Sequence, residues 1–313
     1  MTLGLISAIA SEAGISKGSA LRVAVSAYKR YKVFKIKKRS GDGTRTVAQP
    51  AREVKAIQRA IVQFLSSRLP VHDAATAYVG GSSIYANANF HAGARYLLKM
   101  DFSNFFPSIR PLDIERHLLR HLGSEISPAE VSFVIQACIW RDPEMGGFGL
   151  CIGAPSSPFI SNTILHEFDT SVRSVCDEYL AKYTRYSDDM TFSADGPDVL
   201  AEVERRVRAV VKEMRSPVLL LNENKRVAVS RSAAFRVTGL TLPNQGGVSV
   251  GRKRKRGVRA GVHKFVLGQL DAKGVEKLKG ELAFVLSIEP EFRYVLVETY
   301  GGAIHQLLPG KWH

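Results

Sequence analysis

Apolar side chains recur at intervals of three and four along much of the chain, the pattern of helices buried on one face. The clearest run predicts a helix over residues 50–69, with apolar positions at Val54, Ile57, Ile61, Phe64 and Leu65. Ser127 and Glu130 form a capping box that predicts the start of another helix. Similar patterns predict helices over residues 1–31, 158–180 and 198–214, and from 252 onward.

Short runs of β-branched and aromatic residues separate these helices. Residues 31–36 and 45–47 flank the turn sequence SGDGTR, which predicts a basic β-hairpin. Residues 96–102 predict a strand, 183–193 a second hairpin, and 217–249 several short strands, whereas residues 71–95 are typical of a loop. The combined pattern predicts an α+β fold with helices packed on one antiparallel sheet.

Composition narrows the class of protein. The 313 residues are 45% hydrophobic and 23% charged, which is globular, and the length favours two or three packed subdomains. No stretch is apolar enough for a membrane span, and the N-terminus lacks the basic start of a signal peptide. Three cysteines without metal-binding spacing favour a reducing cytoplasm.

Charge is concentrated at the two ends of the chain. The formal net charge is +15; residues 1–50 carry 10 basic and 2 acidic side chains, and residues 245–313 carry 12 and 6. This distribution favours a polyanionic partner, either a nucleic acid or an anionic membrane surface. A solvated charged surface is the alternative explanation.

Three carboxylates occur where predicted strands end. Asp101 ends the strand at 96–102, and Asp188 and Asp189 lie at the tip of the second hairpin. Adjacent carboxylates repel each other and raise each other's pKa, a cost that a divalent cation relieves. If the two segments are neighbours, the three carboxylates can share two Mg²⁺ ions about 3.5–4 Å apart, as in phosphoryl transfer. The alternative is an exposed Asp-Asp turn without catalytic function.

Six short motifs occur in a consistent order between residues 29 and 263. They are NANFH at 87–91, MDFSNFFPSI at 100–109, GAPSSP at 153–158, YSDD at 186–189, LNENK at 221–225 and VTGL at 237–240. Through these motifs the chain resembles a reverse transcriptase, and more narrowly a bacterial retron reverse transcriptase. In that family NANFH matches the NAxxH signature of retrons, MDFSNFFPSI the first catalytic motif, YSDD the YxDD box and VTGL the primer-grip hairpin.

The resemblance implies a right-hand polymerase with fingers, a palm of antiparallel sheet plus helices, and a helical thumb. We expect an N-terminal helical segment at 1–30, the fingers and palm at 31–243, and an RNA-binding thumb at 244–313. So short a thumb region leaves no room for a maturase, ribonuclease H or endonuclease domain, which disfavours an intron-encoded or retroviral enzyme.

The same resemblance assigns the catalytic and metal-binding residues. Asp101, Asp188 and Asp189 would hold two Mg²⁺ ions, for which Mn²⁺ could substitute, and Phe102 beside Asp101 belongs to the metal site. Lys225 would act as a general acid toward the leaving pyrophosphate. Phosphate contact and a solvated lysine are the alternatives for Lys225.

Further residues are expected to bind the incoming deoxynucleoside triphosphate. Lys38 and Arg45 on the basic hairpin would contact its β- and γ-phosphates, although Lys35 and Lys37 compete with Lys38 for this role. Phe106 would exclude a ribose 2′-OH unless it is a core aromatic. Gly153 would allow close backbone approach to the template, and Ala154 would shape the same pocket.

One position departs from the family pattern. The family usually has glutamine immediately before GAPSSP, and this chain has Ile152. Isoleucine cannot form hydrogen bonds to a sugar or template base, so nucleotide positioning and fidelity are placed in doubt. The metal-binding carboxylates are unaffected.

Two segments are expected to contact RNA. Asn87 and His91 lie in the predicted polar loop, where either a hydrogen-bonded network or an RNA contact would explain them. In the thumb, basic side chains recur at three- and four-residue steps on one helix face that could follow an RNA backbone. These residues are Arg252, Arg256, Arg259 and His263.

As a whole, the resemblance implies an RNA-directed DNA polymerase that copies its own structured noncoding RNA. It would prime from the 2′-OH of an internal guanosine, release branched RNA–DNA (msDNA), and act in antiphage defence with an effector or toxin protein. Two alternatives stay open: another bacterial reverse transcriptase, of abortive-infection or diversity-generating type, and a catalytically idle RNA-binding scaffold.

Overall fold

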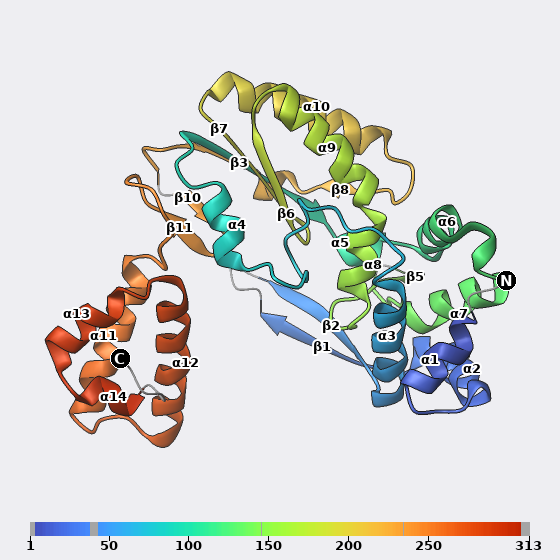
Figure 1. The fold of residues 1–313 in the computed structure, drawn as a ribbon, viewed down its shortest axis with the longest axis horizontal. Coiled ribbons are helices and arrows are strands. Elements are labelled where there is room, and N and C mark those ends of the chain that lie inside the picture. The colour runs from blue at the N-terminus through green and yellow to red at the C-terminus, as the bar shows by residue number, and fades with distance from the viewer. Residues whose placement is uncertain (1–3, 38–42, 145, 234, 308–313) are drawn as a thin grey trace. The chain divides into compact units, whose positions relative to one another are not determined.

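The computed structural model describes residues 4–37, 43–144, 146–233 and 235–307 (Figure 1). The chain forms two compact units. The first comprises Met1–Gly81 and Leu98–Ala228, and the second comprises Ser82–Leu97 and Val229–His313. Each unit is therefore assembled from two separate stretches of sequence.

A five-stranded sheet organises the first unit. Its strand order is β6-β7-β3-β8, and β9 also pairs with β3. The pairs β6–β7 and β3–β8 are antiparallel. The strands are β3 (Tyr96–Ser103), β6 (Lys182–Tyr186), β7 (Asp189–Ala194), β8 (Leu220–Leu221) and β9 (Val227–Ser230).

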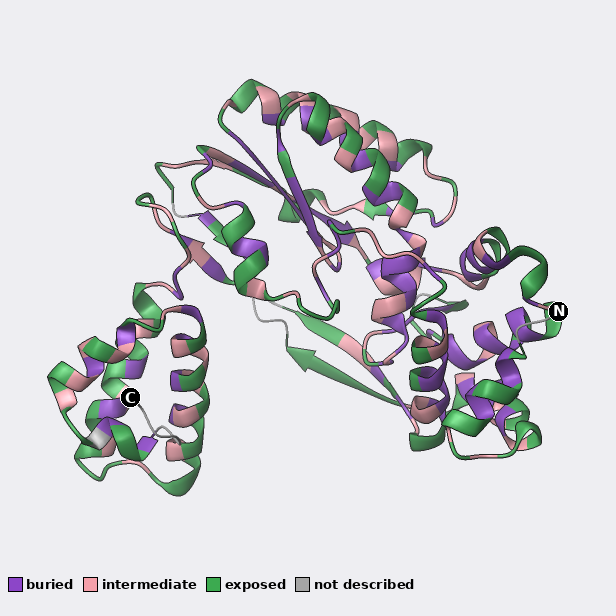
Figure 2. Ribbon diagram, in the orientation of Figure 1, coloured by how far each residue is buried: buried purple, intermediate pink, exposed green. Residues whose placement is uncertain are grey.

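Strand β3 is central because both of its faces are covered. Consecutive residues Leu97 and Leu98 are both buried, as are Met100, Asp101 and Phe102, unlike the alternation of a half-exposed strand. Helices α9 (His166–Glu178) and α10 (Pro197–Glu213) pack on β6 and β7, and Figure 2 shows these strands largely buried. Asp101 is thus a carboxylate on a largely buried strand.

The predicted basic hairpin is confirmed. Strand β1 (Tyr31–Lys37) pairs antiparallel with β2 (Thr44–Pro50), in register from Tyr31 opposite Pro50 to Lys37 opposite Thr44. Most of its residues are exposed (Figure 2). A second short hairpin joins β4 (Trp140–Arg141) to β5 (Phe148–Gly149).

Helices complete the first unit. The capping box at Ser127 is confirmed: its hydroxyl accepts from the Glu130 amide, and the Glu130 carboxylate accepts from the Ser127 amide at 2.9 Å. The other Glu130 oxygen accepts from the Leu5 amide, which ties the N-terminal helix to this one. Besides α9 and α10, the helices of the first unit are α1 (Leu5–Glu12), α2 (Lys17–Ser26), η1 (Ala27–Lys29), α3 (Arg52–Leu65), α5 (Phe105–Ser108), α6 (Pro111–Leu122), η2 (Gly123–Glu125), α7 (Pro128–Cys138), α8 (Ser157–Ile164) and η3 (Glu223–Lys225).

The single helix predicted over residues 158–180 is wrong in one respect. It is divided into α8 and α9 at Leu165, although the Leu165 amide still donates to Ser161 and its carbonyl still accepts from Asp169. The hydroxyls of Ser161 and Thr163 donate back to carbonyls of the preceding turn, a pattern that bends helices. The spacing of apolar residues does not show that these hydroxyls compete with backbone amides for the helix carbonyls.

Two other expectations need correction. Residues 71–95 are not all loop, because α4 (Ile84–Phe90) begins at Ser83, whose hydroxyl accepts from the Ala86 amide. The described strands form four separate sheets instead of one, three of them two-stranded. A short helix with little apolar spacing and a two-stranded ribbon both depend on tertiary packing, which the local pattern does not contain.

The second unit has its own apolar core. Helix α4 packs on the hairpin β10–β11, and the C-terminal helices pack on one another. Buried Val258, Val262, Leu282, Val285 and Leu296 belong to this core. Its elements are β10 (Phe235–Val237), β11 (Leu240–Leu242), α11 (Arg252–Val266), α12 (Ala272–Ile288), α13 (Phe292–Tyr300) and α14 (Ala303–Leu307).

These compact units differ from the three functional segments expected at 1–30, 31–243 and 244–313, which stay a prediction. Residues 82–97 and 229–243 group with the C-terminal helices because their apolar side chains enter that core. No helix within the described ranges has the length and apolarity needed to cross a bilayer.

Candidate active site

Strand pairing brings the three predicted carboxylates together. β3 lies beside β7, and the Phe102 amide donates to the Asp188 carbonyl at 3.2 Å. The turn between β6 and β7 closes with Tyr186 opposite Asp189, and Ser187 adopts a left-handed φ of 63°. The condition set by the sequence, that the Asp101 strand borders the hairpin, is therefore met.

The electrostatics of the site show that it accumulates negative charge. Asp101 is only 3% exposed, and burial raises its pKa to about 7, with Asp188 and Asp189 adding to the rise. Burial also raises the pKa of Asp188, and the charge of Asp189 raises it further. Both shifts have the physical origin expected of like charges in a poorly solvated site.

Lys225 neutralises part of this charge. Its ammonium donates to both oxygens of Asp101, at 2.7 and 2.9 Å, from the end of η3. Burial acts to lower the pKa of Lys225, but Asp101 reverses this and the net pKa is raised. Lys225 therefore stays protonated, which is the form that a proton donor requires.

The donor set fits a hard divalent cation, because Mg²⁺ and related ions prefer carboxylate oxygens. Within the part of the chain that the structure describes, no three acidic, histidine or cysteine side chains already converge as a metal cluster. Lys225 instead holds both oxygens of Asp101. A cation at Asp101 would therefore bind a carboxylate that Lys225 already contacts.

A buried ion pair contacts the turn that carries Asp188 and Asp189. Arg185 and Asp169 have fully buried side chains and are joined by two hydrogen bonds, at 2.6 and 2.8 Å. The remaining Arg185 nitrogen donates to the Ser187 carbonyl at 3.0 Å and to Asn162 at 3.1 Å. Arg185 thus fixes the carbonyl of the strained residue that precedes Asp188.

Lys99, Asp169 and Arg185 were missed by the sequence analysis. Lys99 lies 3.9 Å from Asp189 and precedes Asp101 by two positions, which places both on one face of β3. The available signal was a charged residue within a strand that otherwise reads as buried. Such a residue needs a buried partner, but the sequence does not say where that partner lies.

The hairpin residue Arg45 lies near the catalytic turn. It is exposed on β2, and its charge offsets part of the rise in the pKa of Asp188. Lys38, the other expected phosphate contact, lies outside the described residues. Lys35, one of its competitors, pairs with Glu144 at 2.7 Å. The triphosphate role of the hairpin stays a prediction.

The GAPSSP loop is tied to the same hairpin. The Ala48 amide donates to the Ile152 carbonyl at 2.8 Å. Gly153 has φ +111°, and a Cβ there would lie 2.8 Å from the Ala48 carbonyl oxygen, so glycine is required for close contact with β2. Ala154 is buried against Trp140 and Cys151. Direct nucleotide contact by Gly153 and Ala154 stays a prediction.

The two phenylalanines of the first motif have different surroundings. Phe105 is buried and stacks on Phe102, with centroids 5.9 Å apart and an interplanar angle of 10°. Phe106 is half-buried, with its ring 5.2 Å from that of Phe105. Phe105 is thus the core aromatic, which leaves Phe106 available for the predicted selection against ribonucleotides.

The remaining expected RNA contacts lie in the second unit. Asn87 and His91 are buried at α4, whereas Tyr85 and Phe90 of that helix are exposed. The predicted basic face of α11 is present, since all four of its expected residues are exposed and Val258 and Val262 face the core. Those residues are Arg252, Arg256, Arg259 and His263.

Comparison with known proteins agrees with the family resemblance of the sequence motifs. Residues 36–242 match the model of the family described as reverse transcriptase (RNA-dependent DNA polymerase). The chain is 41% identical to the retron Ec83 reverse transcriptase of Escherichia coli, across 87% of each chain. It is 34% identical to the retron Mx65 reverse transcriptase of Myxococcus xanthus, across 84% of this chain and 62% of that protein.

Among solved structures, an apo telomerase from Candida tropicalis superimposes with a TM-score of 0.50 and 12% identity, covering 87% of this chain and 58% of that one. This likeness concerns the fold, which is the right-hand polymerase fold. The chain belongs to the reverse transcriptase family, and within it to the bacterial retron reverse transcriptases. It is an RNA-directed DNA polymerase that acts on an RNA template and nucleotide substrates, and its family uses divalent metal ions.

Replacing Arg185 separates its structural and positioning roles. Arg185→Met leaves the Asp169 charge buried without its partner and should lower the free energy of unfolding by about 3–5 kcal/mol. Adding Asp169→Leu removes that charge and should recover part of the loss, as urea denaturation would show. Primer extension should stay low in the double variant, because the Ser187 carbonyl has lost its donor; full activity there would contradict the positioning role.

The crowding of carboxylates predicts a pH-dependent stability. A carboxyl group whose pKa is raised by folding favours the folded state at low pH and destabilises it once ionised. Asp188→Asn should therefore raise the melting temperature more at pH 8 than at pH 5, measured in EDTA. The exposed Asp177→Asn is the matched control and should show no such difference; an equal effect of Asp188→Asn at both pH values would argue against a raised pKa of Asp188.

Proposed function

We propose that this enzyme is a retron polymerase that copies part of its cognate structured noncoding RNA into single-stranded DNA. Priming from the 2′-OH of an internal guanosine would give branched RNA–DNA (msDNA). The observation that carries this proposal is the contact between Phe102 and Asp188, which joins the two catalytic motifs in a chain similar to retron enzymes along most of its length.

Asp101, Asp188 and Asp189, with the adjoining Phe102, would hold two Mg²⁺ ions, and Mn²⁺ could substitute. When bound, these ions would activate the primer hydroxyl and neutralise the triphosphate charge. The chain's own residues would do the rest. Lys225, released from Asp101, would protonate the pyrophosphate, and Arg45 would bind the β- and γ-phosphates.

The basic face of α11 would hold the noncoding RNA and its cDNA product. Arg252 and Arg256 form no ion pair with any described residue, so their charge is available to phosphates, whereas Arg254 and Lys255 pair with Glu281 and Glu289. Three buried free cysteines fit our assignment to the cytoplasm. We further place the system in antiphage defence with an effector protein.

The proposal is tested by the nucleic acid that copurifies with the enzyme expressed together with its native upstream region. After RNase treatment, a discrete DNA whose gel mobility changes on debranching is expected. Linear DNA would indicate another type of bacterial reverse transcriptase, and RNA without DNA would leave the scaffold hypothesis. In that last case, extension of a primed RNA template would distinguish an idle scaffold from an enzyme lacking its primer.

Removing the two turn carboxylates should separate catalysis from binding. The Asp188→Ala, Asp189→Ala variant should lose DNA synthesis by at least about 10³-fold, because the cation donors are gone. RNA affinity, measured by filter binding, should remain because the basic face of α11 is intact. Polymerase activity equal to that of the wild type would overturn the metal assignment.

Sugar selection tests the role of Phe106. Phe106→Ala opens space where a ribose 2′-OH would otherwise collide, so the ratio of ribonucleotide to deoxynucleotide incorporation should rise by about 10–100-fold. Single-nucleotide extension with matched substrates measures this ratio. Phe105→Leu is the control, and should change stability more than selectivity because that ring lies in the core.

A further inference from the structure

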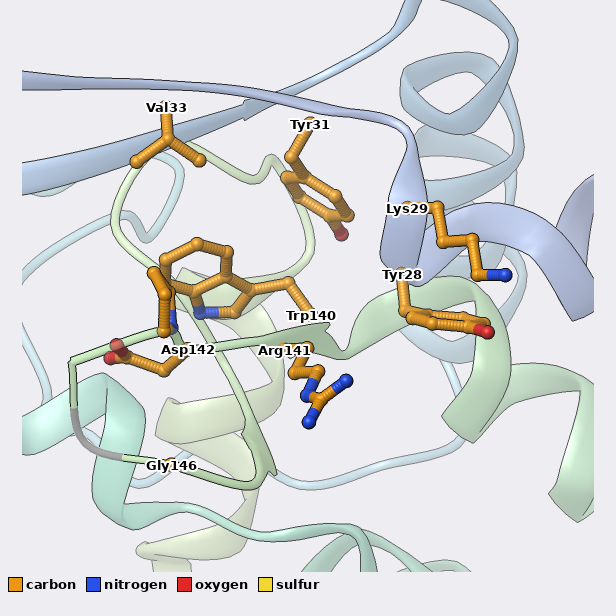
Figure 3. Close-up of a pocket in the computed structure, with 9 residues that line it drawn as sticks. Tyr28, Lys29, Tyr31, Val33, Trp140, Arg141, Asp142 and Gly146 are labelled. Carbon is orange, nitrogen blue, oxygen red and sulfur yellow. The ribbon is translucent and has the colours of Figure 1, made fainter.

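A surface pocket of about 470 Å³ lies in the first unit, between the start of β1 and the β4–β5 hairpin. Figure 3 shows the side chains of Tyr28, Tyr31, Trp140 and Arg141 arranged around it. None of the roles assigned above uses this pocket. The described residues that line it are Tyr28, Lys29, Tyr31, Val33, Trp140, Arg141, Asp142, Pro143 and Gly146.

The lining combines aromatic rings with unpaired cations. The rings of Tyr31 and Trp140 lie 6.2 Å apart, and the Lys29 ammonium lies 5.3 Å from the centre of the Tyr28 ring. Lys29 and Arg141 are exposed and form no ion pair with any residue in the described ranges. Aromatic surfaces beside free cations are the arrangement that binds unpaired nucleotides, since every base has a stackable face and carries a phosphate.

Trp140 supplies an independent observation. It is 4% exposed, and its indole N–H has no hydrogen-bond acceptor in the described part of the chain. Leaving a buried donor without a partner costs free energy, and such groups in native proteins call for an explanation. A base carbonyl or a phosphate oxygen would supply the missing acceptor once the side chains that now cover the indole nitrogen move aside.

The pocket also borders the loop of the GAPSSP motif. Trp140 packs in one apolar cluster with Ala48, Cys151 and Ala154, and Tyr31 packs against that cluster. Two residues that line the pocket therefore pack against the segment that we expect to position template and nucleotide. Asp142 is the acid among the described lining residues, and one of its oxygens accepts from the Glu144 amide at 2.8 Å.

We propose that this pocket binds one unpaired nucleotide of the bound RNA. The inference rests on the proposed function, since that function supplies the RNA. Base-paired segments are excluded as occupants because their bases are already stacked within the duplex. By retaining an unpaired nucleotide, the pocket would let the enzyme distinguish single-stranded positions of the RNA from its stems.

Tryptophan fluorescence tests this directly. The chain has two tryptophans, so Trp312→Phe leaves Trp140 as the only one. In this background, a six-nucleotide oligouridylate should quench the emission of Trp140 saturably, and a blunt RNA duplex should not. Arg141→Ala and Tyr28→Leu should each weaken the binding about three- to tenfold, the loss of one contact, whereas the exposed Arg215→Ala should leave it unchanged.

The possible failures are distinguishable. No quenching, or quenching that Arg141→Ala and Tyr28→Leu leave unchanged, would overturn the pocket assignment. Equal quenching by duplex would assign the pocket to another ligand. Equal quenching by uridine monophosphate at the same concentration would overturn the claim that the nucleotide belongs to a bound RNA, because the pocket would then take the free mononucleotide. Extension of a primed RNA template is measured in parallel with the wild-type enzyme, and its absence would instead count against the proposed function.

Discussion

The burial of Asp101 and Asp188 beside further negative charge is the constraint on which the first unit depends. Asp101 on the buried strand β3 and the Asp188–Asp189 turn are joined through a backbone hydrogen bond, so they cannot separate without breaking the sheet. The raised pKa values of Asp101 and Asp188 express this cost. Cation binding next to these carboxylates would therefore lower the free energy of the folded protein.

The positively charged residues around the three carboxylates have different roles. Arg185 is fully neutralised by Asp169 and acts through its hydrogen bond to Ser187, so it shapes the turn without competing for substrate. Lys225 bonds to Asp101 directly but remains half-exposed, so its ammonium keeps contact with solvent. On α11, Arg252 and Arg256 form no ion pair with any described residue, in keeping with their proposed role at RNA phosphates.

Much of the site was predictable because it depends on local sequence. The strand ending in Asp101, the hairpin with the Asp pair, the basic hairpin with Arg45 and the α11 face were all recognised from short motifs. What the sequence could not supply was the partner of each buried charge. Arg185 and Asp169 are 16 residues apart, and only the packing of α9 on β6 brings them together. Helix α4 was missed because its short polar sequence is stabilised by the core that it joins.

Counting bound ions tests the central claim most directly. Mn²⁺ binding is followed by electron paramagnetic resonance in the presence of a primed RNA template and an unreactive deoxynucleotide analogue. The account predicts two ions per wild-type chain and none held by the protein after Asp188→Ala with Asp189→Ala. Two ions bound equally well by that variant, or none bound by the wild-type enzyme, would contradict it.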